Sequence, residues 1–370
     1  MRIGVPKEIK VQEHRVGMTP VSVREAVAHG HEVWVEANAA ARQGISDEDF
    51  MKAGAKVIPT AAEIFAKCDL IVKVKEPQPA ECRMLREGQT LFTYLHLAPD
   101  PQQAKELMTS GATAIAYETV TGPRGGLPLL APMSEVAGRM AIQAGAHCLE
   151  MEQGGRGMLL GGVAGVAPAK VVVLGGGVAG VNAVRMAVGL EAQVTVLDIN
   201  LERLYALDQQ FGAALTTIFS TRAAVEDYVL DADLVIGAVL VPGASAPRLV
   251  SRKMVEAMKR GSVLVDISID QGGCFETSRP TTHAKPTYIE HEVVHYCVAN
   301  MPGAVARTST FALNNATLPF ILALADKGVG QALKADPHLM AGLNVHAGRI
   351  THANVASALG VEHWGAAFKT

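Results

Sequence analysis

Residues 171–198 read VVVLGGGVAGVNAVRMAVGLEAQVTVLD, the pattern of a strand, a glycine turn, a helix and a second strand that ends in an acid. Gly175, Gly177 and Gly180 form GxGxxG directly after the apolar run VVVL. In such a turn the first glycine permits the bend, the second lets the backbone approach a pyrophosphate, and the third lets the helix pack on the strand. The stretch therefore predicts a dinucleotide site at the positively polarised start of the helix.

Asp198 ends the second strand, where dinucleotide-binding folds place the acid that meets the ribose. A carboxylate there accepts hydrogen bonds from a ribose 2′-OH and repels a 2′-phosphate, so we expect NAD rather than NADP. Arg203 follows closely and is the residue type that accommodates a 2′-phosphate. The alternative to a ligand site is a glycine turn that only packs a helix against a strand.

Similar strand and helix patterns continue on both sides of this stretch. Residues 234–239 and 262–268 are further strand-like runs after it, and helical text follows Pro302. Residues 21–30 and 101–111 look helical. The first third of the chain contains short β-branched or aromatic runs at residues 2–6, 31–36, 55–58, 70–75, 90–95 and 113–118. This alternation predicts α/β architecture with mainly parallel, doubly wound sheets.

Length and composition limit the possible classes. The chain has 370 residues, which suggests two domains, and a net charge of −3, which offers no basic surface for nucleic acid. The apolar region 157–190 is interrupted by Pro168, Lys170 and Arg185, so we expect no membrane span. The five cysteines form no CxxC pair and the N-terminus lacks an apolar signal core, which favours a cytoplasmic location.

A glycine- and proline-rich cluster at residues 122–138 predicts a crossing between domains. Within it Ser134 is a candidate N-cap for a helix over residues 135–153.

Residues 291–295 spell HExxH, a zinc-hydrolase motif when both histidines lie one turn apart on a helix. The surrounding text, YIEHEVVHYCVANMPG, is rich in valine, tyrosine and isoleucine, which favour extended chain. An extended strand separates His291 from His295 too widely for that geometry. We therefore expect no zinc site.

Several blocks together resemble alanine dehydrogenase, in order and spacing, from residue 3 to about 310. They are GVPKEIKVQEHRVGMTP, KVKEP, LFTYLHLA, PMSEVAGRMA, the glycine motif, VDISIDQGG and VVHYCVANMPGAVARTST. The resemblance implies NAD-dependent oxidative deamination of L-alanine to pyruvate and ammonium by a homohexamer. It also implies two Rossmann-like domains, with an NAD-binding domain at 130–305 inserted into a substrate domain formed by 1–129 and 306–370.

Four residues match the family's reacting positions. Arg15 and Lys75 would anchor the substrate carboxylate, a task that suits the planar guanidinium fork of arginine. His96 would exchange a proton with the developing carbonyl oxygen, because its ordinary pKa lies near 6.5. Asp270 would activate water and stabilise the cationic amine. Taken alone, Arg15 and Lys75 are more typical of surface charges, His96 of a structural histidine, and Asp270 of a turn before Gly-Gly.

Asp266 is a weaker candidate than Asp270 because it lies within the preceding strand. The resemblance further implies a set of cofactor contacts. One of them is Ser134, which without the resemblance would be interpreted only as a helix cap. This set is Ser134, Gly175, Gly177, Val178, Ala179, Gly180, Asp198, Arg203, Ser220, Val239, Leu240, Ile267, Ser268, Ile269, Asp270, Arg279, Val298, Ala299, Asn300 and Met301.

The chain departs from the family pattern at a few positions. Val11 and Gln12 replace asparagines, Gly17 replaces alanine, and Glu191 replaces a glycine at the end of the motif helix. Ala323 and Lys327 occupy the positions of an acid and a histidine that bind magnesium in some relatives, so no such metal is expected here.

Other functions share parts of this pattern. The NAD-binding subunit of a nicotinamide nucleotide transhydrogenase has this fold but normally lacks the set of Arg15, Lys75, His96 and Asp270. A saccharopine-type dehydrogenase is a more distant enzyme alternative. A non-catalytic NAD-binding sensor would keep the glycine turn and Asp198 without an acid–base pair.

Overall fold

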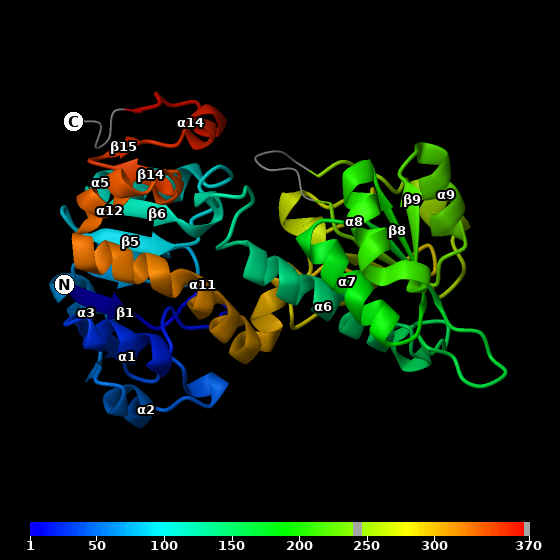
Figure 1. The fold of residues 1–370 in the computed structure, drawn as a ribbon, viewed down its shortest axis with the longest axis horizontal. Coiled ribbons are helices and arrows are strands. Elements are labelled where there is room, and N and C mark those ends of the chain that lie inside the picture. The colour runs from blue at the N-terminus through cyan, green and yellow to red at the C-terminus, as the bar shows by residue number, and fades with distance from the viewer. Residues whose placement is uncertain (240–245, 366–370) are drawn as a thin grey trace. The chain divides into compact units, whose positions relative to one another are not determined.

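The structure is a computed structural model that describes residues 1–239 and 246–365 (Figure 1). It divides into two compact units, one formed by Met1–Met133 with Val305–Thr370 and the other by Ser134–Ala304. The sequence places the corresponding boundaries at 129/130 and 305/306. The second unit therefore interrupts the first along the chain, and each unit is built around its own sheet.

The first unit contains an eight-stranded sheet with the order β15-β14-β6-β5-β4-β1-β2-β3. Neighbours from β3 to β6 pair in parallel, whereas β14 is antiparallel to both β6 and β15. Figure 1 shows β5, β6 and β14 as neighbours, although β14 comes from the far end of the chain. The strands are Arg2–Val5 (β1), Glu32–Glu36 (β2), Lys56–Ile58 (β3), Leu70–Val72 (β4), Thr90–Thr93 (β5), Thr113–Ala116 (β6), Leu343–His346 (β14) and Arg349–Ile350 (β15).

Local signals start the helices of this unit. Thr19 accepts a hydrogen bond from the Ser22 N–H before Pro20, and Asp100 does the same for Gln103 before Pro101. Asn314 on α11 joins the two chain segments, because its side chain accepts from the Thr19 N–H at 2.7 Å. The helices are Pro20–Ala28 (α1), Asp47–Lys52 (α2), Ala61–Lys67 (α3), Pro79–Cys82 (α4), Pro101–Ser110 (α5), Ala306–Lys327 (α11), Val329–Ala335 (α12), Pro337–Met340 (α13) and Ala353–Leu359 (α14), with 3-10 turns at Ala41–Gln43 (η1) and Tyr117–Thr119 (η2).

The second unit has a seven-stranded sheet with the order β12-β13-β11-β10-β7-β8-β9, parallel except for β12. The strands are Lys170–Leu174 (β7), Gln193–Asp198 (β8), Leu215–Phe219 (β9), Leu234–Gly237 (β10), Val263–Asp266 (β11), Thr287–Glu290 (β12) and Val293–Tyr296 (β13). The helices are Ala131–Cys148 (α6), Val178–Gly189 (α7), Leu201–Phe211 (α8), Arg222–Leu230 (α9) and Arg252–Ala257 (α10), with 3-10 turns at Met151–Gln153 (η3), Gly212–Ala214 (η4), Ile267–Gln271 (η5) and Met301–Val305 (η6). The predicted fold class, two doubly wound α/β units, is confirmed.

Two details of the sequence prediction need correction. Ser134 is not an N-cap, because α6 already begins at Ala131 and Ser134 lies in its first turn. Pro132, with its fixed backbone angle, favours this earlier start. The helix also ends at Cys148 rather than continuing to Gln153, where a separate 3-10 turn lies. Strand β9 is not among the strands predicted from the sequence. Two threonines interrupt the alternation of apolar and polar residues in its sequence, LTTIF.

Three predicted strands of the first unit end two or three residues early. The predicted runs 70–75, 90–95 and 113–118 stop as strands at Val72, Thr93 and Ala116. The residues beyond these ends include the polar or charged Lys73, Lys75, Tyr94, Tyr117 and Glu118. Within residues 1–239 and 246–365, no helix combines the length and apolar character that crossing a membrane requires.

Candidate active site and dinucleotide site

The turn between β7 and α7 has the geometry that its glycines predict. Gly175 has a φ of +97°, which favours glycine. A Cβ on Gly180 would lie 1.8 Å from the Gly175 carbonyl oxygen, so only glycine lets the helix pack this closely on the strand. A Cβ on Gly177 would meet no atom within 4 Å. Gly177 therefore begins α7 with open space beside it, where a pyrophosphate would approach the helix N-terminus.

Other predicted cofactor residues gather at the same edge of the sheet. The strand order reverses between β7 and β10, and such a switch point places ligands at the carboxyl ends of the strands. Val239 follows β10, and its carbonyl accepts a 2.6 Å hydrogen bond from the Ser268 hydroxyl. Ser220 follows β9, and its N–H donates to the Asp198 carbonyl at 3.0 Å. Leu240 lies outside the described residues.

Asp198 and Arg203 are both bound to the glycine turn. The Asp198 carboxylate accepts from the Gly176 N–H at 2.6 Å and from the Asn200 N–H at 2.8 Å. The Arg203 guanidinium donates through Nε to the Gly176 carbonyl. Backbone N–H groups thus fix the carboxylate of Asp198, which would select a ribose hydroxyl. Gly176 contacts both this carboxylate and the Arg203 guanidinium.

The two candidate carboxylates after β11 differ sharply. Asp266 is buried and accepts from the N–H groups of Ser268 (3.0 Å) and Cys274 (2.9 Å) and from the Ser278 hydroxyl (2.5 Å). Burial raises the pKa of Asp266. Asp270, in η5, is exposed and makes no hydrogen bond or ion pair with the described part of the chain. Asp266 therefore stabilises the loop, and Asp270 presents its carboxylate to the surroundings.

The remaining predicted cofactor residues differ in how deeply their side chains are buried. The side chains of Ile269, Val298 and Met301 are buried, which leaves their backbone groups for any ligand. Asn300 has a φ of +63° within the 298–301 loop. Arg279 lies with its guanidinium carbon 3.7 Å from the centre of the Tyr288 ring and pairs with a β12 carboxylate.

The HExxH run is not helical, as its composition predicts, but it begins in the turn of a β-hairpin and is not one continuous strand. His291 and Glu292 have φ values of +52° and +60° and make the two-residue turn between β12 and β13. His295 is buried on β13, where Nδ1 donates to the Val293 carbonyl and Nε2 lies 2.7 Å from the Thr277 hydroxyl. Burial lowers the pKa of His295. The described residues contain no group of three or more His, Cys, Asp or Glu arranged to hold a metal.

In the first unit the strand order reverses between β1 and β4, and Arg15 lies in the segment that follows β1. Arg15 is 1% exposed, so it is not the surface charge that its residue type taken alone would favour. Its Nε and Nη2 donate to the two carboxylate oxygens of Glu13 at 2.8 and 2.6 Å. Burial alone lowers the pKa of Arg15, but Glu13 outweighs burial and raises it. A substrate carboxylate would therefore meet a cation whose Nε edge already has an internal partner.

Lys75 follows β4 and is also buried, at 9% exposure. Its backbone N–H donates to Glu8 at 3.3 Å, and the Val74 N–H donates to the same oxygen at 2.6 Å. Lys73 lies beneath this turn, fully buried, with Nζ 3.0 Å from Glu8 and 2.7 Å from Glu81. Burial alone would lower the pKa of Lys73, but Glu8 and Glu81 outweigh burial and raise it.

His96 follows β5 with a φ of +49°, a region that few residues other than glycine adopt. Its ring stacks on Tyr94, with centroids 5.8 Å apart and planes 8° apart. The side chain is 44% exposed, and Nδ1 lies 4.0 Å from Glu118 Oε1. The His96 N–H donates to the same carboxylate at 2.6 Å.

Three carboxylates thus hold the three predicted residues of this unit. Glu13 accepts from the Arg15 N–H at 3.0 Å, just as Glu8 and Glu118 accept from Lys75 and His96. None of these three acids is among the residues predicted from the sequence. The available signal was their position, since Glu8 and Glu13 flank the segment after β1 and Glu118 ends the run TAIAYE. Asp270 and the cofactor residues belong to the other unit.

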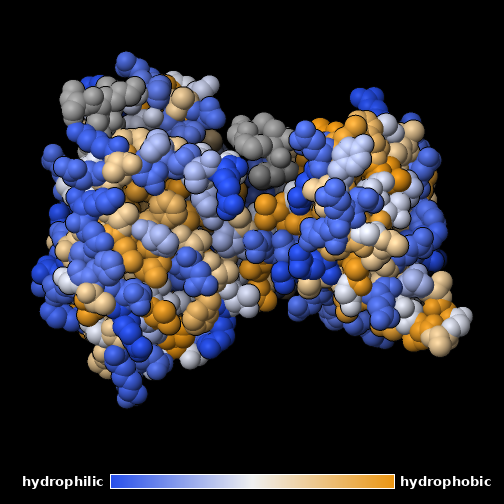
Figure 2. Space-filling model, in the orientation of Figure 1, coloured by the Kyte–Doolittle hydropathy of each residue, from blue (hydrophilic) through white to orange (hydrophobic). Residues whose placement is uncertain are grey.

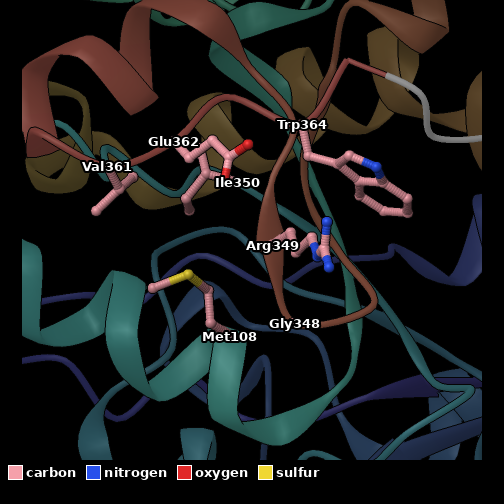
Figure 3. Close-up of a pocket in the computed structure, with 7 residues that line it drawn as sticks. All are labelled: Met108, Gly348, Arg349, Ile350, Val361, Glu362 and Trp364. Carbon is pink, nitrogen blue, oxygen red and sulfur yellow. The ribbon is translucent and has the colours of Figure 1, made fainter.

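A hollow of about 270 Å³ lies elsewhere in the first unit (Figure 3). It is lined by Met108, Gly348, Arg349, Ile350, Val361, Glu362 and Trp364. None of the predicted site residues lines it. It is therefore no part of the candidate active site.

Comparison with known proteins covers almost the whole chain. Residues 4–137 match the family described as alanine dehydrogenase/PNT, N-terminal domain, and residues 141–353 match its C-terminal domain. An alanine dehydrogenase of Halomonas elongata is 61% identical over 367 residues, or 99% of each chain.

Solved structures also resemble this chain in fold. An L-alanine dehydrogenase superimposes with a TM-score of 0.94 at 54% identity, covering 97% of this chain and 99% of that one. A transhydrogenase from Sinorhizobium meliloti superimposes with a TM-score of 0.81 at 26% identity, covering 95% and 99%.

Proposed function

The chain belongs to the alanine dehydrogenase/PNT family, and from that premise we propose that it oxidises L-alanine to pyruvate and ammonium with NAD. One observation carries the choice within the family. The chain is 61% identical to an alanine dehydrogenase over 99% of both proteins, but 26% identical to a transhydrogenase of the same fold. The reaction converts L-alanine, NAD⁺ and water into pyruvate, ammonium, NADH and a proton.

The glycine turn and Asp198 fit the cofactor. Open space beside Gly177 leaves room for a pyrophosphate at the start of α7, and Asp198 is held where a ribose hydroxyl would donate to it. When bound, NAD⁺ supplies the acceptor for the hydride that leaves Cα of the substrate. The chain supplies binding, orientation and proton transfer.

Arg15 and Lys75 bind the substrate carboxylate in this proposal. Both cations are at least nine-tenths buried, and charges in such an environment attract an anion more strongly than they would in water. Glu13 keeps Arg15 charged and fixes its orientation through two hydrogen bonds. Glu8 fixes the backbone at Lys75 through the Lys75 N–H.

His96 and Asp270 perform the acid–base steps. His96 takes the proton from the hydroxyl of the intermediate as its carbonyl forms, a role that needs an accessible imidazole, and its ring is partly exposed. Asp270 carries an exposed carboxylate, suited to stabilise the cationic amine and to orient the attacking water. Asp266, with its oxygens bonded to the loop, has a structural role.

An assay of NADH formation tests the proposal. Purified protein with L-alanine and NAD⁺ should generate NADH, and pyruvate with ammonium should consume it. A transhydrogenase would pass hydride between two nucleotides without an amino acid, and an NAD-binding sensor would bind NADH without turnover. Failure to reduce NAD⁺ with L-alanine would exclude the proposed reaction.

We also propose that the chain assembles as a homohexamer, which family membership supports. Residues 157–168 form an apolar loop whose Leu159, Val163 and Val166 are 61–66% exposed. Figure 2 shows this loop as an orange patch at the lower right, an apolar surface of the kind that marks protein contacts. Light scattering after gel filtration should give six times the monomer mass, and a monomeric species would contradict the assembly.

A cytoplasmic location completes the proposal. All five cysteines are buried and free, as expected of a protein kept in a reducing compartment. Fractionation of the source cells, with the protein followed by antibody, would test this location.

A further inference from the structure

Glu118 contacts the His96 segment at three points. Its carboxylate accepts from the His96 N–H at 2.6 Å and from the Leu95 N–H at 3.2 Å, and it lies 4.0 Å from His96 Nδ1. The side chain is 15% exposed, so water competes weakly for these contacts. Glu118 comes from η2, which follows β6, whereas His96 follows β5, and these two strands are neighbours. The contact therefore depends on the sheet.

The backbone of His96 needs such support. A φ of +49° is uncommon for a residue with a side chain and persists only where the surrounding structure imposes it. Two hydrogen bonds to one carboxylate fix the two successive N–H groups of this bend. The stacked Tyr94 ring fixes the plane of the imidazole from another side. The ring is therefore oriented with Nδ1 on the side of Glu118 and Nε2 directed away from it.

Two further groups face Glu118, namely Tyr94, whose pKa is raised mainly by burial, and His352, just before α14. Burial lowers the pKa of His352, with Glu118 opposing this effect. His352 is thus neutral near pH 7 and does not neutralise the carboxylate. The charge of Glu118 is directed mainly at the His96 segment.

We propose that Glu118 is the positioning residue for His96, holding its backbone bend and keeping a proton on Nδ1 so that Nε2 exchanges protons with the substrate. The inference rests on the proposed alanine dehydrogenase activity for its kinetic consequences. A carboxylate beside one ring nitrogen favours the tautomer with hydrogen on that nitrogen. The opposite nitrogen then carries the lone pair that takes the proton from the substrate hydroxyl.

Replacing Glu118 with glutamine tests this role because the side chain keeps its size and loses its charge. An amide accepts through one oxygen only, so the Leu95 N–H, which contacts both carboxylate oxygens at 3.3 and 3.2 Å, loses one of its two acceptors. The preference for hydrogen on Nδ1 disappears with the charge. We expect Glu118→Gln to lower kcat by about 100-fold, the lower end of what acid–base assistance contributes. The KM for pyruvate and the affinity for NADH should stay within about threefold of wild type, since neither ligand touches Glu118 in this proposal.

Glu36 offers a matched control. Its carboxylate accepts from the Lys7 N–H at 2.7 Å, the same kind of contact between a strand end and a neighbouring loop, but it holds no reacting residue. Glu36→Gln should leave kcat within about twofold of wild type, because only one loop contact is lost. Glu118→Asp keeps the charge and should recover a measurable part of the activity that Glu118→Gln loses. Thermal unfolding of all three variants shows that each is folded.

Nitrogen NMR of protein labelled with ¹⁵N-histidine reads the tautomer directly, with His96→Asn used to assign the signal. Wild type should show hydrogen on Nδ1 of His96, and Glu118→Gln should shift the population toward Nε2. An unchanged tautomer, an unchanged kcat, or an equal loss in Glu36→Gln would overturn the proposal. The NMR result does not depend on turnover, so an inactive wild-type protein would count against the proposed function while leaving the role of Glu118 measurable.

Discussion

At the scale of single residues, the candidate substrate site consists of buried charges that are already paired within the protein. Arg15 forms an ion pair with Glu13, and Lys73 forms ion pairs with Glu8 and Glu81. Lys75 is buried as well, at 9% exposure. Breaking a buried pair is costly, because the remaining charge has neither water nor a partner. These internal carboxylates therefore balance the three cations and keep them ordered before a substrate arrives.

Lys75 gives the clearest residue-scale prediction. Lys75→Ala should raise the dissociation constant for pyruvate about ten- to hundredfold, because a hydrogen bond to a charged group contributes roughly 1.5–3 kcal/mol. NADH binding should stay unchanged. Lys56, an exposed lysine paired with Glu32, is the control, and Lys56→Ala should affect neither ligand. Normal pyruvate affinity in Lys75→Ala would remove this residue from the site.

At the scale of the element, the turn from β7 to α7 separates packing from ligand binding within six residues. Gly180 is needed for the helix to lie against the strand, since a Cβ there would lie 1.8 Å from a carbonyl oxygen. Gly177 has open space and a φ of −66°, which any residue adopts. Helix packing therefore requires a glycine at position 180, whereas at position 177 only a bound ligand would require one.

Substituting each glycine by alanine distinguishes these reasons. Gly180→Ala should destabilise the protein by about 1–3 kcal/mol or more through overpacking, seen as a lower midpoint in urea. Gly177→Ala should leave that midpoint nearly unchanged and weaken NADH binding, because the added methyl group occupies space beside the pyrophosphate. Equal loss of stability in both variants would contradict the assignment of the open side to the ligand.

Strand β13 contributes a pH-dependent term through His295. Burial lowers the pKa of His295 below the ordinary 6.5, so the unfolded chain takes up its proton first as the pH falls. The folded state is therefore destabilised as pH drops below about 6.5, with a slope of at most about 1.4 kcal/mol per pH unit from this group. Urea unfolding between pH 5 and 7 should show a shallower slope in His295→Gln. Identical slopes would mean that His295 does not titrate differently on unfolding.

At the scale of the whole molecule, the proposed chemistry draws on both units of the chain. His96 belongs to the unit formed by Met1–Met133 with Val305–Thr370, and Asp270 to the unit Ser134–Ala304. The two acid–base residues of the proposal therefore belong to different units. We therefore expect that substituting the binding residues of one unit leaves the affinity of the other unit for its own ligand unchanged.

A double variant tests this shared role. His96→Ala and Asp270→Asn should each lower kcat by roughly 10²–10⁴-fold while NADH still binds, as expected for acid–base groups. If both act in one sequence of proton transfers, the double variant should lose less than the product of the single losses. Stopped-flow turnover, with NADH binding followed by fluorescence, measures both quantities. Near-normal turnover in Asp270→Asn would reduce this residue to a turn former.

The sequence by itself determined the α/β class, the glycine turn with Asp198, and the non-helical character of the HExxH run. These depend on local properties: strand periodicity, the backbone freedom of glycine, and the strand preference of β-branched and aromatic residues. Only the tertiary structure decided that Arg15 and Lys75 are buried, that α6 begins before Ser134, and that three glutamates hold the predicted residues. The physical reason is that burial and charge pairing depend on which strand ends become neighbours. The order β6-β5-β4-β1 brings Glu8 to Lys75 and Glu118 to His96 across long stretches of chain, a relation that no local pattern encodes.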